Sequence, residues 1–394
     1  MVSKLKNIGI LEIHYHVKFL NSMIRICKTK NTHVTVFTTK EIYSRLKINL
    51  DNPSKYEFVL KKEDESINSF MRRVQKICNE KIDLLFINTI QTLLMDIAHY
   101  IRFKPKSKMI LTIHITNHWL KAKYAFNIKK IVRSIDANIC LFLIRRIILQ
   151  KFDAINVIYP PTRDYVLNST NYKKKVFTLP FNFYDEDKKT KKTVKDDKLR
   201  IVISGKIEEF RRDYDLALDV FEKIFEKYND KIFFYLLGKP VGRYGERIIK
   251  RCEKLKERGY NIYYPAGFVS EEEYNQILLD SDIYFSPLKI RKIIDTGIEE
   301  IYGLSEGSAI PFEAIQNSRP LILPKEFKII KELESSTVKY DSSDDLEYKI
   351  VDLIQNRKVL ENLKEKAIEN SKYFSLEVLQ DYFNKEILDK LDSL

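Results

Sequence analysis

The chain of 394 residues has no long apolar run, since none reaches the roughly 18 residues that a membrane-spanning helix needs. Its first residues, MVSKLKNIGILEIHYHVKF, turn polar after one short strand and show no small-residue cleavage site, so we expect no signal peptide. Cysteine is scarce, and its four positions form no C-x-x-C pair. This pattern favours free thiols in a cytoplasmic protein over disulfides. The cysteines are Cys27, Cys78, Cys140 and Cys252.

Glycine is scarce in the first part of the chain. Of ten glycines, one is Gly9 and the other nine lie between Gly205 and Gly307. Histidine shows the opposite distribution, with all six at or before His118. Because glycine lets a backbone approach a ligand closely, we expect the backbone of the later part to approach a ligand in this way. The earlier part supplies the imidazole side chains.

Acidic residues are few in the first 180 positions, which hold 32 Lys and Arg against 13 Asp and Glu. The remaining positions hold 37 against 42, so the formal charge of +14 comes entirely from the earlier part. Such a balance predicts an anionic partner, such as nucleic acid, a phospholipid surface or a phosphorylated lipid. Residues 121–151 combine apolar faces with eight basic residues and one acid. This segment is typical either of a membrane-surface helix or of core helices with solvated lysines.

Short β-rich apolar runs alternate with helical patterns along the chain, which predicts parallel sheets covered by helices on both faces. Residues 185–198, DEDKKTKKTVKDDK, carry eleven charges in fourteen positions and predict a solvated linker. We therefore expect an α/β protein with two Rossmann-like domains. The expected parts are an N-terminal domain (1–184, the first half), the linker, a C-terminal domain (199–372, the second half), and a helix (373–394) that returns to the first half.

Individual elements follow from the same periodicities. A helix is expected over 92–103, a helix with Ser270 as its N-cap over 270–279, and another over 308–316. The expected strands are 8–13, 33–38, 56–60, 83–88, 109–115, 154–159 and 175–179 in the first half, and 199–204, 232–237, 261–264, 283–286 and 320–323 in the second.

The segment 203–214, ISGKIEEFRRDY, contains the first candidate site. A strand ends at Gly205, Lys206 follows, and Arg211 and Arg212 stand at a helix start. Glycine allows close approach, and cations together with free helix N–H groups hold phosphate. The alternative is a solvated charged loop before an ordinary helix.

The segment 302–320, YGLSEGSAIPFEAIQNSRP, contains the second. Small residues at Ser305, Gly307 and Ser308 precede a helix that carries Glu313 in its first turn. The helix N-terminus can receive phosphate oxygens, and a carboxylate there can hold both hydroxyls of a ribose. The alternative for Glu313 is simple compensation of the helix dipole. Both segments follow strand ends, where open α/β sheets bind ligands.

These segments carry a family resemblance over about 125 residues, from 199 to 324. The order GKIEEFRR, LLG, GFVSEEEY, SDIYFSP and EAIQNSRPLI is similar to the donor half of retaining glycosyltransferases of family 4, which have the GT-B fold. The resemblance implies that the two Rossmann-like domains face each other across a cleft. The resemblance implies that Lys206 and Arg211 or Arg212 bind the donor diphosphate and that Glu313 holds the ribose. The sequence departs from the E-x7-E pattern, because Ser305 stands eight positions before Glu313 and Glu306 comes one position late. The glycine pair after the first strand is replaced by EIHYHV at 12–17.

Two histidines are candidate cleft residues. His114 ends the strand ILTIHI, where family members often place a histidine facing the transferred sugar. An imidazole there can bond a sugar hydroxyl or handle a proton near pH 7. His16, after the first strand, could line the same cleft. The alternative for both is a hydrogen-bonded core histidine. No H-x-x-x-H or Cys/His cluster is present, so no metal and no cofactor beyond the co-substrate are expected.

The sequence thus predicts a glycosyltransferase that moves a sugar from a nucleotide diphosphate sugar to an acceptor hydroxyl, without a metal. Retention of configuration is implied by the resemblance alone. We expect a cytoplasmic protein, peripheral on an anionic membrane surface, whose acceptor is a lipid-linked glycan or a surface polysaccharide precursor. The predicted catalytic residues are His114, Lys206 and Arg212, and the predicted donor-binding residues are Gly205, Lys206, Arg211, Arg212, Ser305, Glu306, Gly307, Ser308 and Glu313.

Three alternatives remain. A nucleotide-sugar 2-epimerase would share the fold but needs paired acid–base carboxylates, which the first half does not show. A catalytically silent subunit is compatible with the missing first glutamate of E-x7-E. A nucleic-acid-binding protein would fit the basic charge but not the lack of interleaved stacking aromatics.

Overall fold

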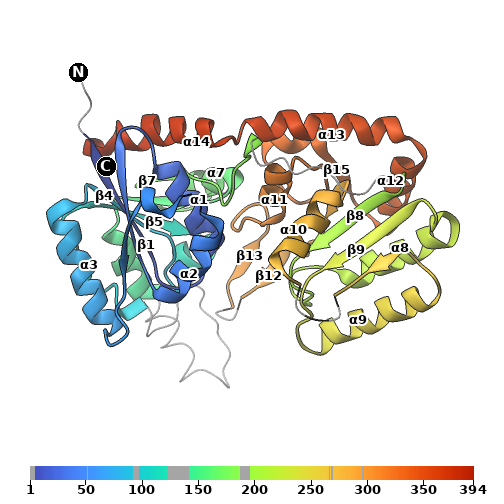
Figure 1. The fold of residues 1–394 in the computed structure, drawn as a ribbon, viewed down its shortest axis with the longest axis horizontal. Coiled ribbons are helices and arrows are strands. Elements are labelled where there is room, and N and C mark those ends of the chain that lie inside the picture. The colour runs from blue at the N-terminus through green and yellow to red at the C-terminus, as the bar shows by residue number, and fades with distance from the viewer. Residues whose placement is uncertain are drawn as a thin grey trace.

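The computed structural model describes residues 5–50, 52–91, 97–121, 142–186, 196–265, 267, 269–294 and 297–394. Figure 1 shows two α/β parts side by side, the first half in blue to green and the second in yellow to orange. Most of the predicted linker, residues 187–195, lies outside the described residues, as does most of the basic segment, residues 122–141. Within the described part, no helix is long and apolar enough to span a membrane.

The first half is built on a seven-stranded sheet whose neighbouring strands all run parallel. Its central strands, such as β4 and β6, bury every side chain, as expected when helices cover both faces of a sheet. In spatial order they are β3 (Glu57–Leu60), β2 (Thr32–Thr38), β1 (Lys6–Glu12), β4 (Leu84–Ile87), β5 (Lys108–Ile113), β6 (Ala154–Val157) and β7 (Lys175–Thr178).

The second half repeats this plan with six parallel strands. In spatial order they are β10 (Ile262–Tyr263), β9 (Ile232–Leu237), β8 (Leu199–Ser204), β11 (Ile283–Phe285), β14 (Leu321–Pro324) and β15 (Thr337–Tyr340). A separate antiparallel hairpin joins β12 (Arg291–Ile293) to β13 (Glu299–Ile301).

Helices connect the strands on both sides of each sheet (Figure 1). In the first half they are α1 (Val17–Cys27), α2 (Lys40–Asn49), α3 (Ile67–Lys81), α5 (Thr116–Leu120) and α7 (Pro160–Ser169). In the second half they are α8 (Tyr214–Tyr228), α9 (Gly242–Glu257), α10 (Glu271–Asp280), α11 (Ile310–Asn317), α12 (Ser343–Gln355) and α13 (Arg357–Lys372).

The chain returns to the first half at its C-terminal end. Helix α14 (Leu376–Tyr382) follows α13, and Figure 1 shows the two in red along one side of both halves. Gln380 of α14 donates to the carbonyl oxygens of Arg25 and Lys28 at the end of α1. The Lys108 ammonium, on β5, donates to the Leu394 carbonyl oxygen at 2.8 Å.

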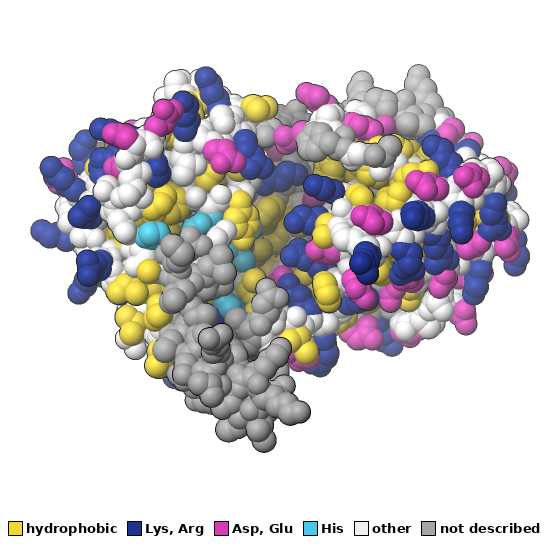
Figure 2. Space-filling view, turned by 90° about the horizontal axis from the view of Figure 1, so that it is seen from below, with side chains coloured by type: hydrophobic (Ala, Val, Ile, Leu, Met, Phe, Trp, Pro, Cys, Tyr) yellow, Lys and Arg dark blue, Asp and Glu magenta, His cyan; other side chains and the backbone are white. Residues whose placement is uncertain are grey.

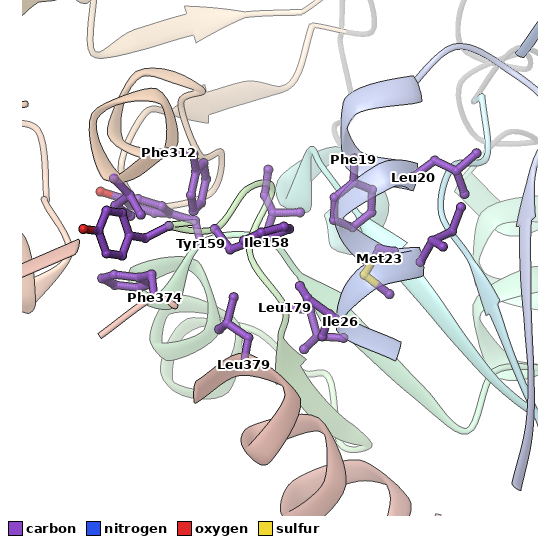
Figure 3. Close-up of a cluster of buried hydrophobic side chains, with 14 of the residues drawn as sticks. Phe19, Leu20, Met23, Ile26, Ile158, Tyr159, Leu179, Phe312, Phe374 and Leu379 are labelled. Atoms are coloured by element: carbon purple, nitrogen blue, oxygen red, sulfur yellow. The ribbon is translucent and has the colours of Figure 1, made fainter. Parts of the chain in front are cut away.

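One apolar core joins the halves beneath the cleft. Figure 3 shows α1 residues such as Phe19 and Met23 near Ile158 and Tyr159, which follow β6, with Phe312 of α11 beyond them. Tyr159 is fully buried, and its hydroxyl donates to the Lys328 carbonyl oxygen at 2.9 Å. The two sheets therefore share packed side chains and are not joined by the linker alone.

Several elements differ from the sequence expectation. Residues 97–98 are the only described helical positions of the helix expected over 92–103, and residues 92–96 lie outside the described part. Helix α11 begins at Ile310, with Pro311 in its first turn, and not at Ser308. Helix α9, strand β15 and the β12–β13 hairpin were not anticipated. Cys27, Cys78 and Cys252 are free and buried, and Cys140 is outside the described residues.

Candidate functional site

The carboxyl ends of β8 and β9 approach each other more closely than a side chain would allow. A Cβ atom on Gly238 would lie 1.8 Å from the Gly205 carbonyl oxygen. Gly205 has φ +99°, and a Cβ there would meet the Arg212 guanidinium at 3.1 Å. Both positions therefore require glycine.

A pocket of about 470 Å³ opens at these strand ends. Its walls come from three successive βα connections of the second half, which matches the usual ligand position in an open α/β sheet. The lining residues are Gly205, Lys206, Leu237, Gly238, Lys239, Pro240, Gly267, Val269 and Tyr274.

Glu313 is held at the side of this pocket by two hydroxyl groups. Ser204 at the end of β8 donates to Oε2 at 2.6 Å, and Tyr274 of α10 donates to Oε1 at 3.0 Å. Burial, and then the Glu313 charge, raise the pKa of Tyr274 well above its ordinary value. Tyr274 therefore keeps its proton and donates. The carboxylate is therefore fixed in place against Tyr274, which lines the pocket.

The three predicted cations occupy different environments. Lys206 is exposed and lines the pocket. Arg212 is buried against Gly205, and its Nε donates to Ser286 at 3.2 Å. Arg211 is more exposed and forms an ion pair with Glu208 at 2.8 Å. Helix α8 begins at Tyr214, and its N-cap, Asp213, accepts from the Leu216 N–H. The two arginines thus precede the helix and do not form part of it.

The small residues before α11 lie in the contact between the halves. Ser305 is fully buried, and its carbonyl oxygen accepts from Thr116 N of the first half at 3.0 Å. A Cβ on Gly307 would meet the Tyr159 side chain at 3.0 Å. Ser308 is also buried, and none of the three lines the pocket. The structure therefore does not place them with Gly205 and Lys206 in the pocket lining.

Glu306 belongs to a buried ion pair that sequence reasoning missed. Its carboxylate lies 2.7 Å from the ammonium of Lys292, and both side chains are only about a tenth exposed. Lys292 lies on β12 and also stacks over the Tyr302 ring at 4.9 Å. Only the unpredicted hairpin brings this lysine to Glu306, so spacing in the sequence offered no signal for it.

His16 and His114 meet on the first-half side of the cleft. Their rings are stacked at 4.3 Å, and His114 Nε2 donates to the Asn88 carbonyl oxygen at 3.0 Å. Burial lowers the pKa of His114 to about 4, and burial with the neighbouring His114 and His14 lowers that of His16 to about 3. Both imidazoles are therefore neutral at pH 7. Figure 2 shows histidines on one side of the hollow between the halves and Lys and Arg on the other.

Glu12, which ends β1, is a buried acid that was not among the predicted site residues. It is fully buried and accepts from the Thr89 hydroxyl at 2.7 Å and from the His14 N–H at 2.8 Å. Burial raises its pKa to about 7. The sequence signal that could have identified Glu12 is an acidic residue at the end of an otherwise apolar strand.

A third acid, Glu300 of β13, connects the halves at the hairpin. It is fully buried, and its two carboxyl oxygens accept from the N–H groups of His118 and Asn117 in α5, at 2.7 and 3.3 Å. Burial raises the pKa of Glu300 to about 7, and the Glu306 charge acts in the same direction. The contact therefore contains an acid that titrates near neutral pH.

Replacing Glu300 by glutamine should remove a pH-dependent part of the stability. Because the folded pKa exceeds the unfolded value of 4.5, the contribution of Glu300 is fully present below pH 4.5 and is lost as the pH rises through 7. The loss is on the order of 3 kcal/mol. We expect Glu300→Gln to gain thermal stability relative to the native chain between pH 5 and pH 8. The control is Glu299→Gln, a change at the exposed neighbour, which should show no such gain. If the thermal stability of Glu300→Gln and of the native chain changed with pH in parallel, the raised pKa of Glu300 would be contradicted.

Comparison with known proteins identifies the fold. No family model and no curated protein sequence matches the chain. HepE of Anabaena, in a structure with UDP and glucose, matches with a TM-score of 0.64 and 11% identity over 98% of this chain and 99% of that one. The α,α-trehalose-phosphate synthase (UDP-forming) of Burkholderia vietnamiensis matches with a TM-score of 0.56 and 10% identity over 99% and 100%. A putative UDP-N-acetylglucosamine 2-epimerase of Listeria monocytogenes matches with a TM-score of 0.53 and 10% identity over 95% of this chain and 94% of that one.

At these identities the likeness shows the fold, which is the GT-B arrangement of two Rossmann-like domains across a cleft. The expectation of that fold is confirmed. No group of three or more His, Cys, Asp or Glu side chains within the described residues could hold a metal ion.

Proposed function

We propose that the chain is a glycosyltransferase that moves a sugar from a nucleotide diphosphate sugar to an acceptor hydroxyl. The observation that carries the proposal is the pocket at the ends of β8 and β9, with Glu313 fixed beside it by Ser204 and Tyr274. A carboxylate so held can accept both hydroxyl protons of a ribose. The presence of UDP in the HepE structure of the same fold supports this assignment.

The diphosphate is assigned to the region around Gly205. The Gly205–Gly238 approach leaves backbone exposed to a ligand, while Lys206 and Arg212 supply positive charge. Negative charge develops on the departing phosphate during transfer, and preplaced cations stabilise it most in a site that excludes water. These residues take the role that a metal ion has in other folds, so the reaction is assigned as metal-independent.

The sugar and the acceptor are assigned to the cleft between the pocket and the first half. His16 and His114 are neutral there and can accept a hydrogen bond from a sugar hydroxyl. Glu306, one of the predicted donor-binding residues, is already paired with Lys292, so the two side chains would contact a donor sugar as one neutral ion pair. Retention of configuration rests on the resemblance to family 4.

The acceptor is proposed to be a lipid-linked glycan or a surface polysaccharide precursor, met at the cytoplasmic face of a membrane. The described part of the basic segment, residues 142–150, is helical. It exposes Leu143 and Ile147, each 52% accessible, beside the cation Arg146. Exposed apolar side chains next to cations are typical of a surface that meets anionic lipid.

The epimerase alternative shares the fold and has one point in its favour, the unpredicted acid Glu12 in the first half. However, Glu12 is fully buried and bonded to Thr89 and His14. It is therefore not placed as one of two acid–base groups facing a sugar. Formation of a 2-epimer from a nucleotide sugar without any acceptor would favour the epimerase instead.

Replacing Glu313 by alanine tests the donor site. Its ribose bonds exist equally in the ground and transition states, so their loss should raise the donor KM and dissociation constant about tenfold, with a smaller change in kcat. Calorimetric titration of the full chain with UDP, GDP and ADP, followed by assay of the matching nucleotide sugars, measures both quantities. Glu365→Ala, an exposed glutamate of α13, is the control. Native-like affinity and KM in Glu313→Ala would refute the ribose assignment.

A further inference from the structure

A second, smaller pocket lies in the first half and shares no residue with the pocket at the ends of β8 and β9. Its volume is about 180 Å³. Pockets for drug-sized ligands begin at about 300 Å³, so this one has room for a phosphate-sized group but not for a nucleotide. Its walls come from the end of α5, the helix over 142–150 and the segment before β7. The lining residues are Trp119, Leu120, Arg146, Leu149, Gln150, Asn171, Tyr172, Lys173 and Lys174.

Three cations line this small pocket, and no carboxylate is among its lining residues. The Lys174 ammonium donates to the carbonyl oxygens of Gln150 and Phe152 at 2.7 and 2.5 Å, which fixes its position and leaves its charge uncompensated. Arg146 and Lys173 are exposed, and neither forms an ion pair with a carboxylate among the described residues. The small pocket therefore favours an anion.

Tyr172 adds a hydroxyl group to the small pocket. Its oxygen is buried and makes no hydrogen bond within the described part of the chain. Burial, and then the Asp153 charge, raise the pKa of Tyr172, so the hydroxyl keeps its proton. Asp153 itself is paired with Lys108 at 3.3 Å. A buried hydroxyl without a partner is costly, and an acceptor oxygen from a ligand would satisfy it.

The helix over 142–150 carries exposed apolar side chains beside this pocket. Leu143 and Ile147 are each 52% accessible. Residues three and four apart lie on one side of a helix, so both share a face with Arg146. A free phosphate ion would use the pocket alone and leave this apolar face without a role. Apolar side chains next to an anion pocket fit a ligand that presents acyl chains and a phosphate together.

We propose that the small pocket binds the phosphate group of an anionic lipid, held by Arg146, Lys173 and the Tyr172 hydroxyl, while Leu143 and Ile147 enter the membrane surface. This inference rests on the proposed membrane location and adds a defined headgroup site to it. It does not depend on the donor site, because the two pockets have no residue in common.

The experiment is sedimentation of the full chain with vesicles of phosphatidylcholine, with and without phosphatidylglycerol. The native chain should bind the anionic vesicles more tightly. Arg146→Met and Lys173→Met should each weaken that binding about tenfold. Tyr172→Phe should weaken it about fivefold although no charge changes, because only a bound phosphate accepts from the hydroxyl. The matched control is Lys250→Met, a change at an exposed lysine of α9 in the second half, which should bind like the native chain.

Two results would overturn the inference. Native affinity in Tyr172→Phe, with losses in both cation variants, would show a diffuse attraction to the membrane and no headgroup site. Thermal stabilisation of the native chain by glycerol phosphate, without binding to either kind of vesicle, would assign the small pocket to a soluble phosphate. Neither result would alter nucleotide binding or its loss in Glu313→Ala, so the proposed glycosyltransferase would stand. Failure of the native chain to bind any nucleotide, with the expected vesicle results, would refute the donor site and support the lipid site.

Discussion

Replacing Lys206 or Arg212 by alanine is expected to lower kcat about a hundredfold while weakening donor binding much less. One preplaced charge acting on the transition state contributes on the order of 3 kcal/mol, and that contribution is realised only as the phosphate departs. Arg212 should show the larger effect, because it is buried against Gly205 and keeps a fixed orientation through Ser286. Steady-state kinetics with varied donor concentration separates kcat from KM.

The matched control is Lys227→Ala, in the last turn of α8 and far along the helix from Arg212. As an exposed substitution it should change stability by less than about 0.5 kcal/mol and leave the kinetics unaltered. Near-native turnover in both Lys206→Ala and Arg212→Ala would show that the phosphate contacts lie elsewhere in the cleft. Loss of activity in EDTA, restored by manganese or magnesium, would show that a metal ion and not these cations stabilises the leaving group.

Gly238→Ala should abolish donor binding and destabilise the second half. The new Cβ would lie 1.8 Å from the Gly205 carbonyl oxygen, a backbone atom, and the two glycines directly follow the paired strands β8 and β9. Neither strand end can shift without breaking the register that forms the pocket. We expect a loss of about 3 kcal/mol in the free energy of unfolding, the upper end for overpacking. Thermal unfolding and nucleotide titration measure the two effects.

The comparison variant is Gly267→Ala, which lies in the wall of the same pocket. A Cβ there would meet no atom within 4 Å, so this variant should fold and bind nucleotide like the native chain. If Gly238→Ala also bound nucleotide normally, the close approach of the two strands would not be what shapes the donor site.

Local sequence patterns predicted two Rossmann-like domains, and the family resemblance added their GT-B arrangement. Strands such as β1 and β8 are short, apolar and buried on both faces, so their composition alone indicates a parallel sheet. Ser270 was expected as an N-cap and accepts from the Glu273 N–H at 3.1 Å. Gly205 and Lys206 were singled out because they follow a strand end, and both line one pocket, while Glu313 bonds Ser204 at the end of the same strand.

The rest of the site depends on contacts between segments that are distant in sequence. Ser305 and Gly307 have the composition of a phosphate loop, yet Thr116 and Tyr159 of the first half bury them. Glu306 pairs with Lys292, 14 positions earlier, because the β12–β13 hairpin brings the two together. No hydrophobic periodicity in the sequence predicted that hairpin. Such features depend on how the two halves dock, and a single sequence carries no local signal of that docking.

The return of α14 to the first half also constrains the order in which the chain can fold during synthesis. Phe383, Ile387 and Leu391 are buried in the same core as Phe19 and Met23, and they are more than 350 positions away in sequence. Domains made first on the ribosome generally fold first. Here the first half stays without part of its core until the whole second half has been translated. Its apolar surface is exposed during that interval, so the nascent chain is a natural client for chaperones that cover such surfaces.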